Sequence, residues 1–280
     1  IGQQLPDTTL NEVHVRDTRT PSADIRLSGF SAGQQAQQID SATLARYSQQ
    51  SLATLLTQQL PVFVRSYSFN GLATLGLRGA SAAQSQVLWN GIPISNAATG
   101  VADLSALPTL MAGNVTMVYG GSAALFGSGN VGGAIVMNTA TARFDTNAST
   151  LSVNSGVGSF AQYSGALRAT HSTRKLYVAA TAQAQTAQNN YMYTGTNGEP
   201  TTMSNSRLRN ASGMLHAAYK LPGAHKLEAM LWWQQYNRQI PPALFESYSA
   251  KQQQDGALRS VASWTFTKGH STWYARTSLT

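Results

Sequence analysis

The second half of the chain alternates between apolar and polar residues with a period of two. In residues 175–186, for example, Leu176 and Val178 fall on one side while Tyr177 and Thr181 fall on the other. Successive side chains of a β-strand project from opposite faces, so this alternation predicts strands with one apolar and one polar face. Seven segments show the pattern, and we predict strands at residues 149–157, 161–171, 175–186, 207–220, 225–238, 251–267 and 271–280.

The links between these predicted strands alternate in length. The short links are residues 172–174, 221–224 and 268–270, and the long ones are residues 188–206 and 239–250. Barrels that cross a membrane have short turns at one end and long loops at the other. Both this alternation and a belt of aromatic residues beside the short links favour an antiparallel transmembrane β-barrel over a soluble sandwich. The belt residues are Tyr219, Trp264, Phe266 and Trp273.

The first half of the chain predicts a mixed α+β domain. Leu52 and Leu56 belong to a leucine stripe with helical spacing, within a helical stretch over residues 39–59 that Ser51 can cap and Pro61 ends. Short apolar and β-branched runs predict strands in the same half. These strands are expected at residues 74–78, 86–89, 114–118 and 134–137.

A glycine-rich stretch covers much of residues 119–139. Within it, Gly127, Gly129 and Gly132 satisfy the pattern G-x-G-x-x-G, which cradles a pyrophosphate in nucleotide-binding domains. That fingerprint requires a strand before the glycines and a helix after them, whereas residues 134–137 predict a strand. A soluble α+β enzyme with a glycine-rich nucleotide-binding loop is therefore kept as the alternative function.

Together with residues 75–94, this stretch resembles the plug domain of TonB-dependent outer-membrane receptors. The shared motifs are a strand that carries an Arg-Gly pair, here Arg78-Gly79, and an apolar strand that ends in the turn Asn90-Gly91-Ile92-Pro93. A stretch of the family form Y-G-x-x-A-x-x-G-x-G-x-x-G-G-x-I then appears at residues 119–135, with one more residue between Gly120 and Gly127 than that form has. The resemblance rests on motifs in the first half and on the strand pattern in the second. It implies an α+β plug domain followed by antiparallel transmembrane β-barrel strands.

The resemblance implies three regions along the chain. They are an N-terminal tail at residues 1–28, the plug domain at 29–145 and the N-terminal portion of the barrel at 146–280. Plugged transporters have about 22 strands, so the seven predicted strands make a partial barrel and we expect the chain to be a fragment of a longer receptor. The expected location is the outer membrane of a Gram-negative bacterium.

Receptors of this family take up scarce nutrients actively, and the resemblance implies siderophore-bound iron or a cobalamin-like compound as the nutrient. The implied partners are the nutrient ligand, the lipid bilayer and a TonB-type periplasmic energy transducer, with a surface lipoprotein as a further candidate. The transducer would bind the tail as an added strand. The implied "TonB box" in the tail consists of Leu10, Asn11, Glu12, Val13, His14 and Val15.

Loops of the predicted plug and barrel carry the candidate ligand-binding residues, because function concentrates on the polar, glycine-rich loops of a packed domain. Aromatic and amide side chains in these loops suit a bulky, partly apolar solute. The resemblance also implies that Arg78 forms an ion pair between the plug and an acidic residue of the barrel wall. The candidate ligand-binding residues are Tyr67, Phe69, Asn70, Ile94, Ser95, Asn96, Tyr191 and Tyr193.

Composition excludes several other kinds of site. The 280 residues include no cysteine, which rules out disulfides, thiol chemistry and cysteine metal sites. The five histidines are scattered singly, and no paired-carboxylate, nucleophile-elbow or calcium-loop pattern occurs. We therefore predict no catalytic set, no metal site, no cofactor and no enzyme activity. The net charge of +8 is spread singly over the second half, so no nucleic-acid partner is expected.

Overall fold

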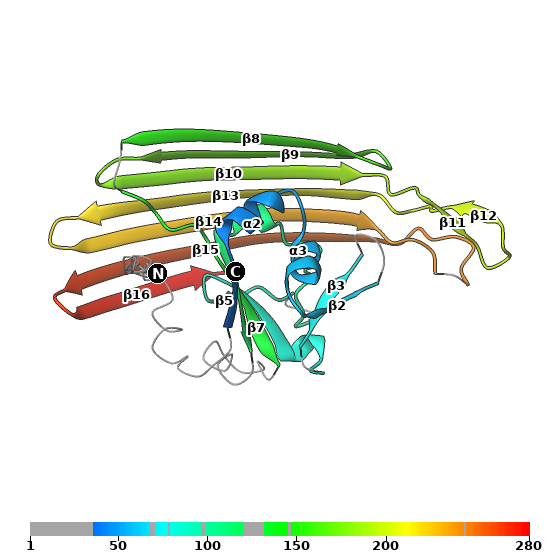
Figure 1. The fold of residues 1–280 in the computed structure, drawn as a ribbon, viewed down its shortest axis with the longest axis horizontal. Coiled ribbons are helices and arrows are strands. Elements are labelled where there is room, and N and C mark those ends of the chain that lie inside the picture. Colours follow the sequence, from blue (N-terminus) through cyan, green and yellow to red (C-terminus); the bar gives the residue numbers. More distant parts are fainter. Residues whose placement is uncertain are drawn as a thin grey trace, which may run out of the picture.

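The computed structural model describes residues 36–67, 71–77, 79–96, 99–119, 132–144, 147–243 and 245–280. They form an N-terminal domain of short elements and a long seven-stranded sheet, the wall, against which this domain packs (Figure 1). Several residues with predicted functions lie outside the described ranges. They are residues 10–15 of the tail, Phe69, Asn70 and Arg78.

A five-stranded sheet forms the centre of the N-terminal domain. Its strands are β1 (Ala36–Ile39), β4 (Ser85–Trp89), β5 (Ile92–Pro93), β6 (Asn114–Tyr119) and β7 (Gly133–Asn138). They lie in the order β1-β6-β7-β4-β5, with β4 and β7 parallel and the other neighbours antiparallel. Asn90 and Gly91 join β4 to β5 with φ angles of 48° and 80°, as the predicted Asn-Gly hairpin turn requires.

The glycine-rich stretch connects β6 to β7, which are antiparallel neighbours. A dinucleotide-binding loop requires a helix directly after its third glycine, and here β7 begins at Gly133 instead. Close packing explains why residue 132 is a glycine. A Cβ added there would lie 2.7 Å from the Cβ of Ala80 and 2.9 Å from the carbonyl oxygen of Leu77. This topology contradicts the nucleotide-loop alternative.

Two helices, α2 (Ser41–Arg46) and α3 (Leu52–Gln59), replace the single helical stretch that the sequence predicted. The break arises because Asp40 and Ser51 each accept a hydrogen bond from a backbone N–H group of the turn that follows them. Ser51 has an extended backbone, with φ −78° and ψ 159°, so it cannot continue a helix and instead starts a new one. The predicted cap at Ser51 is confirmed, whereas the continuity of the stretch is wrong.

The remaining elements of the N-terminal domain are a hairpin and two short 3-10 turns. The hairpin pairs β2 (Phe63–Ser66) with β3 (Ala73–Gly76), and the turns are η1 (Ala82–Gln84) and η2 (Thr109–Met111). None of the described helices has the length and apolarity needed to cross a membrane. The apolar core of the domain runs on into the wall, because it includes the wall residues Met214, Trp232 and Val261.

Seven long antiparallel strands form the wall. They are β8 (Ala148–Gly158), β9 (Gln162–Ser172), β10 (Leu176–Ala187), β13 (Leu208–Leu221), β14 (His225–Gln239), β15 (Gln252–Lys268) and β16 (Ser271–Leu279). They pair in chain order, and each boundary lies within one residue of its prediction. A hairpin of β11 (Met192–Thr194) and β12 (Pro200–Thr202), which the sequence did not predict, lies in the long link between β10 and β13.

The two ends of the wall differ, as the loop lengths predicted (Figure 1). The turns β9–β10, β13–β14 and β15–β16 meet at the short-turn end, and the long links β10–β13 and β14–β15 meet at the long-loop end. The two faces differ as well: Leu227, Leu231 and Trp233 are 40–45% exposed on the outer face. Trp232 and Gln234, which alternate with Leu231 and Trp233 in β14, are buried on the inner face against the N-terminal domain.

The predicted aromatic belt lies on the outer face at the short-turn end. Tyr219 and Trp264 both stand opposite Leu227 in the strand register, and Phe266 stands opposite Trp273. Tyr219 is 42% and Trp273 63% exposed, whereas Trp264 and Phe266 are half-buried and stack against His225. A band of exposed rings at one level of a sheet is typical of strands that meet a membrane interface.

Candidate functional site

A cavity of about 1720 Å³ lies between the N-terminal domain and the wall. The domain contributes the β2–β3 hairpin and nearby loops, and the wall contributes the parts of β14 and β15 nearest the long links. This cavity is lined by four of the residues that were predicted from the sequence to bind the ligand. They are Tyr67, Ile94, Ser95 and Asn96.

Tyr191 and Tyr193, the other described candidates, lie in the β10–β13 link and not among the residues that line the cavity. Tyr193 stands in β11 opposite Thr201, and the Tyr191 ring packs edge-on against Phe160 with centroids 5.9 Å apart. The two tyrosines therefore belong to the long-loop end of the wall, the same end that the cavity occupies.

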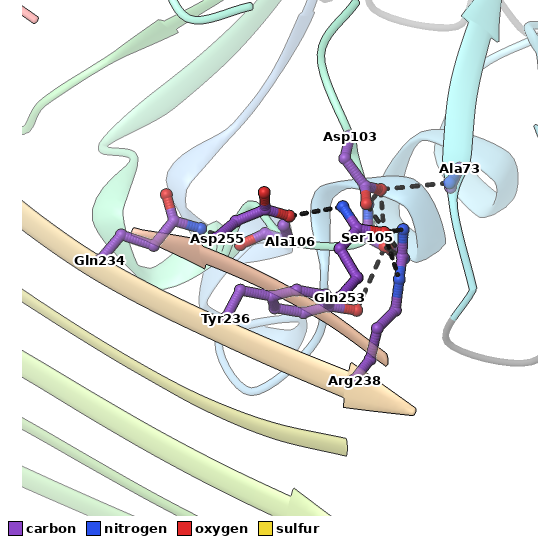
Figure 2. Close-up of polar contacts among 9 residues, drawn as sticks. All are labelled: Ala73, Asp103, Ser105, Ala106, Gln234, Tyr236, Arg238, Gln253 and Asp255. Carbon is purple, nitrogen blue, oxygen red and sulfur yellow. Dashed lines mark hydrogen bonds and ion pairs between the residues drawn. The ribbon is translucent and has the colours of Figure 1, made fainter. Parts of the chain in front are cut away.

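A buried ion pair joins the N-terminal domain to the wall beside the cavity (Figure 2). Nη1 of Arg238, in β14, lies 3.0 Å from Oδ2 of Asp103, and the two side chains are 5% and 14% exposed. The other oxygen of Asp103 accepts hydrogen bonds from the backbone N–H groups of Ala73 and Ser105 and from the Ser105 hydroxyl. One carboxylate therefore ties its own loop, strand β3 and the wall together.

Strand β15 holds the arginine of this pair from the other side (Figure 2). Arg238 donates from Nε and Nη2 to the side-chain oxygen of Gln253, at 3.1 and 2.6 Å. The Gln253 amide in turn donates to Asp255 at 2.5 Å, and the Tyr236 hydroxyl lies 3.3 Å from the Ser105 hydroxyl. Charge-assisted hydrogen bonds on both sides fix the orientation of the guanidinium group.

A second polar link crosses the same interface further along β14. Gln234 donates to the backbone carbonyl of Ala106 and accepts a hydrogen bond from Arg259 of β15 at 3.0 Å. The Arg259 guanidinium also lies over the Trp232 ring, 4.8 Å from its centroid. Gln234 and Arg259 both line the cavity, so a solute bound there would touch groups that hold the domain in place.

The Asn90-Gly91 turn is a further point of attachment to the wall. The Asn90 side chain donates to the Thr139 hydroxyl at 2.9 Å and lies 3.1 Å from the Met230 sulfur of β14. Arg276 of β16 donates to the backbone carbonyl of Asn90. The turn that carries part of the family resemblance therefore positions the domain against two strands of the wall, β14 and β16.

Asp103 and Arg238 were not predicted to be partners. The family resemblance implied an ion pair between Arg78 of the domain and an acidic residue of the wall, whereas in the described pair the domain supplies the carboxylate and the wall the arginine. One signal was available, because Arg238 falls on the polar face of a predicted strand and a buried arginine needs an anionic partner. Nothing in the local sequence of Asp103 marks it as that partner.

Side chains that favour metal ions do not gather in the described part of the chain. No three His, Asp or Glu side chains there lie close enough together to hold a metal ion. Near the short-turn end, Glu228 binds His216 Nε2 and Lys226 Nζ, each at 2.7 Å. None of these three residues lines the cavity, so this cluster belongs to the packing of the wall.

The first half of the chain matches a family model described as the TonB-dependent Receptor Plug Domain, over residues 28–134. The chain carries the plug domain of the TonB-dependent receptors. The N-terminal domain is thus the plug, and the resemblance inferred from its motifs is confirmed. No curated protein matches the sequence.

Solved structures extend the likeness to the wall. The copper transporter OprC has 16% identity and a TM-score of 0.69, and covers 87% of this chain and 37% of its own. The siderophore receptor PiuA from Acinetobacter baumannii has 11% identity and a TM-score of 0.66, with 88% and 36% covered. A ferric enterobactin receptor from Pseudomonas aeruginosa has 14% identity and a TM-score of 0.63, with 86% and 40% covered.

These likenesses confirm the predicted fold class, a plug domain followed by a partial antiparallel sheet of the receptor type. The chain spans between 36% and 40% of the length of these three solved chains.

Proposed function

We propose that the chain carries the plug and part of the barrel of a transporter that takes up a metal or metal chelate across the outer membrane of a Gram-negative bacterium. The observation that carries this proposal is the plug packed on the inner face of the wall, with a cavity of about 1720 Å³ at the long-loop end. The exposed apolar face of the wall suits lipid, and its buried polar face suits a plugged lumen.

The proposed substrate is a bulky, partly apolar chelate of the siderophore-iron or cobalamin-like class. The cavity combines the ring of Tyr67, which is 63% exposed, with the polar side chains of Ser95 and Asn96. Its volume exceeds the roughly 300–1,000 Å³ usual for small-molecule sites, which supports a large solute. Ile94 belongs to the same lining, and the remaining proposed ligand contacts are Phe69, Asn70, Tyr191 and Tyr193.

Substitution of cavity residues tests the proposed binding site. We expect Tyr67→Ala or Asn96→Ala to weaken chelate binding about tenfold, or ~1.4 kcal/mol, because each removes one direct contact. Tyr248→Ala is the matched control, since Tyr248 is 77% exposed in the β14–β15 link and does not line the cavity. Binding of ferric siderophores and cobalamin to cells that produce the full-length receptor gives the measurement. Unchanged binding in both cavity variants would remove this site.

Energy coupling is proposed to pass through the tail, at residues 10–15, to a TonB-type periplasmic transducer. Val13→Pro removes a backbone donor and blocks strand addition, so uptake should fail while chelate binding at the cell surface persists. Normal uptake by this variant would reject the coupling segment.

Fractionation of the full-length protein separates this proposal from a soluble enzyme. A receptor sediments with the outer membrane and needs detergent to dissolve, and recovery without detergent would contradict the proposal. A surface lipoprotein partner remains a prediction, which co-purification from detergent extracts would test.

A further inference from the structure

Basic residues gather at the short-turn end of the wall. Among the described wall residues, Glu228 is the only acidic residue at this end, and it stands at the register level of Arg276; five more basic residues lie closer to the turns. The long-loop end is mixed, since Glu199, Glu246 and Asp255 accompany its basic residues. The five residues that form this basic rim are Arg174, Lys175, Lys220, Lys226 and Lys268.

Three members of the basic rim have no compensating charge in the described part of the chain. Lys226 pairs with Glu228 at 2.7 Å, and Lys220 lies 4.5 Å from the Phe144 ring centroid. Arg174, Lys175 and Lys268 are exposed, and no described carboxylate lies within 4.0 Å of their charged groups. Exposed positive charges at one end of a sheet create a local field that attracts anions.

The basic rim lies directly beside the aromatic belt. Lys268 follows Phe266 by two residues in β15, so both side chains project from the outer face, where Phe266 stands opposite Trp273. Exposed Trp and Tyr rings mark the level of the headgroups in a membrane. The centres of the β9–β10 and β15–β16 turns lie four strand spacings apart, or ~19 Å at the usual spacing of neighbouring strands. The rim is therefore wide enough to meet more than one headgroup.

We infer that the basic rim binds the phosphate groups of anionic phospholipids in the leaflet that meets the short-turn end. Lysine and arginine beside an interfacial belt are attracted to anionic lipid surfaces, and their long stems let the charge reach the headgroup. A phospholipid satisfies the rim and the belt together, because its phosphate meets the cations while its chains meet the rings. This site is separate from the chelate cavity, although the inference rests on the proposed membrane placement.

Quenching of the belt tryptophans tests the inference directly. The full-length receptor is reconstituted into vesicles of phosphatidylethanolamine and phosphatidylglycerol, with bromine on the chains of one lipid or the other. The difference in fluorescence between the unmodified receptor and the Trp264→Phe/Trp273→Phe variant is the signal of the two belt tryptophans. We expect brominated phosphatidylglycerol to quench this part more than brominated phosphatidylethanolamine at equal mole fraction, and we expect added salt to reduce the difference.

Matched variants separate the charge of the rim from its fold. The triple variant Arg174→Gln/Lys175→Gln/Lys268→Gln should lose the preference for phosphatidylglycerol, and Arg174→Lys/Lys175→Arg/Lys268→Arg should retain it. The control Arg207→Gln/Arg209→Gln, at the long-loop end, should also retain it. Equal quenching by both lipids in the unmodified receptor, or a preference that survives the neutral triple variant, would overturn the inference. Chelate binding should be unchanged in all of these variants, so failure of the proposed transport function would be seen separately.

Discussion

The ion pair between Asp103 and Arg238 shows how single residues fix the plug against the wall. Both side chains are almost completely buried, so each charge depends on the other for the interactions that water would otherwise supply. The surrounding hydrogen bonds from Ser105 and Gln253 hold the pair in one arrangement. Loss of either partner would leave the other as an uncompensated buried charge.

Substitution of Asp103 by Ala should therefore destabilise the attachment of the plug by about 3–5 kcal/mol, the usual cost of breaking a buried pair from one side. Lys251→Ala is the matched control, because Lys251 pairs with Glu246 at 2.6 Å but is 59% exposed, and exposed pairs contribute only about 0–1 kcal/mol. Denaturant unfolding of the full-length receptor, followed by protease cleavage within the plug, measures both effects. Equal, small losses in the two variants would show that the buried pair does not hold the plug.

At the scale of elements, sequence reasoning succeeded where the two faces of a strand meet different surroundings. In β14 the residues Leu231 and Trp233 face outward while Trp232 and Gln234 face the plug. A period of two in the sequence is enough to predict that neighbouring residues lie on opposite faces. The same reasoning missed the break between α2 and α3, because the spacing of apolar residues does not show that a second helix begins at a new N-cap. It also missed β11 and β12, whose three residues each are too short to show a period.

Contacts between elements were much harder to predict than the elements themselves. The cavity gathers loop residues that the sequence had selected for their chemistry, such as Tyr67 and Asn96. Its wall side, including Gln234 and Arg259, was predicted only to lie in strands, at residues 225–238 and 251–267. Partners such as Asp103 and Arg238 lie far apart in the chain, and their meeting depends on how the plug is rotated against the wall, which no local pattern records.

The long link between β14 and β15 provides a prediction about pH. Glu246 accepts hydrogen bonds from Lys251 Nζ and from the backbone N–H of Ala243, and these contacts hold the pKa of the carboxyl below its usual value of 4.5. A lowered pKa means that the carboxylate stabilises the folded link above pH 4.5 and that this contribution is lost as the pH falls through the lowered value. We expect hydrogen exchange in residues 240–251, measured relative to the intrinsic rate of an unprotected amide at the same pH, to rise in acid. Glu246→Gln should abolish this pH dependence, and an identical rise in that variant would show another cause.

At the scale of the whole molecule, three of the contacts that attach the plug to the wall lie in separate places. The first is the Asp103–Arg238 pair beside the cavity, and the second is the Asn90-Gly91 turn. The third is Phe144, which packs with Tyr177 and Ala218 of the wall toward the short-turn end. Phe144 follows the last plug strand on the way to β8, so it can stay in place while the plug sheet moves. The loop around Asp103 borders the cavity, so the proposed transport function requires this loop to separate from β14 before a substrate moves inward.

Cross-links at two of these places test which attachment opens during transport. The chain has no cysteine, so an introduced pair reacts without competition from this region. Ser105→Cys with Gln253→Cys joins two residues that both contact Arg238, and a short bismaleimide across them should block uptake while chelate binding persists. Phe144→Cys with Ala218→Cys, joined in the same way, should leave uptake intact because that contact need not open. Uptake that survives the first cross-link, or is blocked by the second, would mean that the plug leaves its place by a different route.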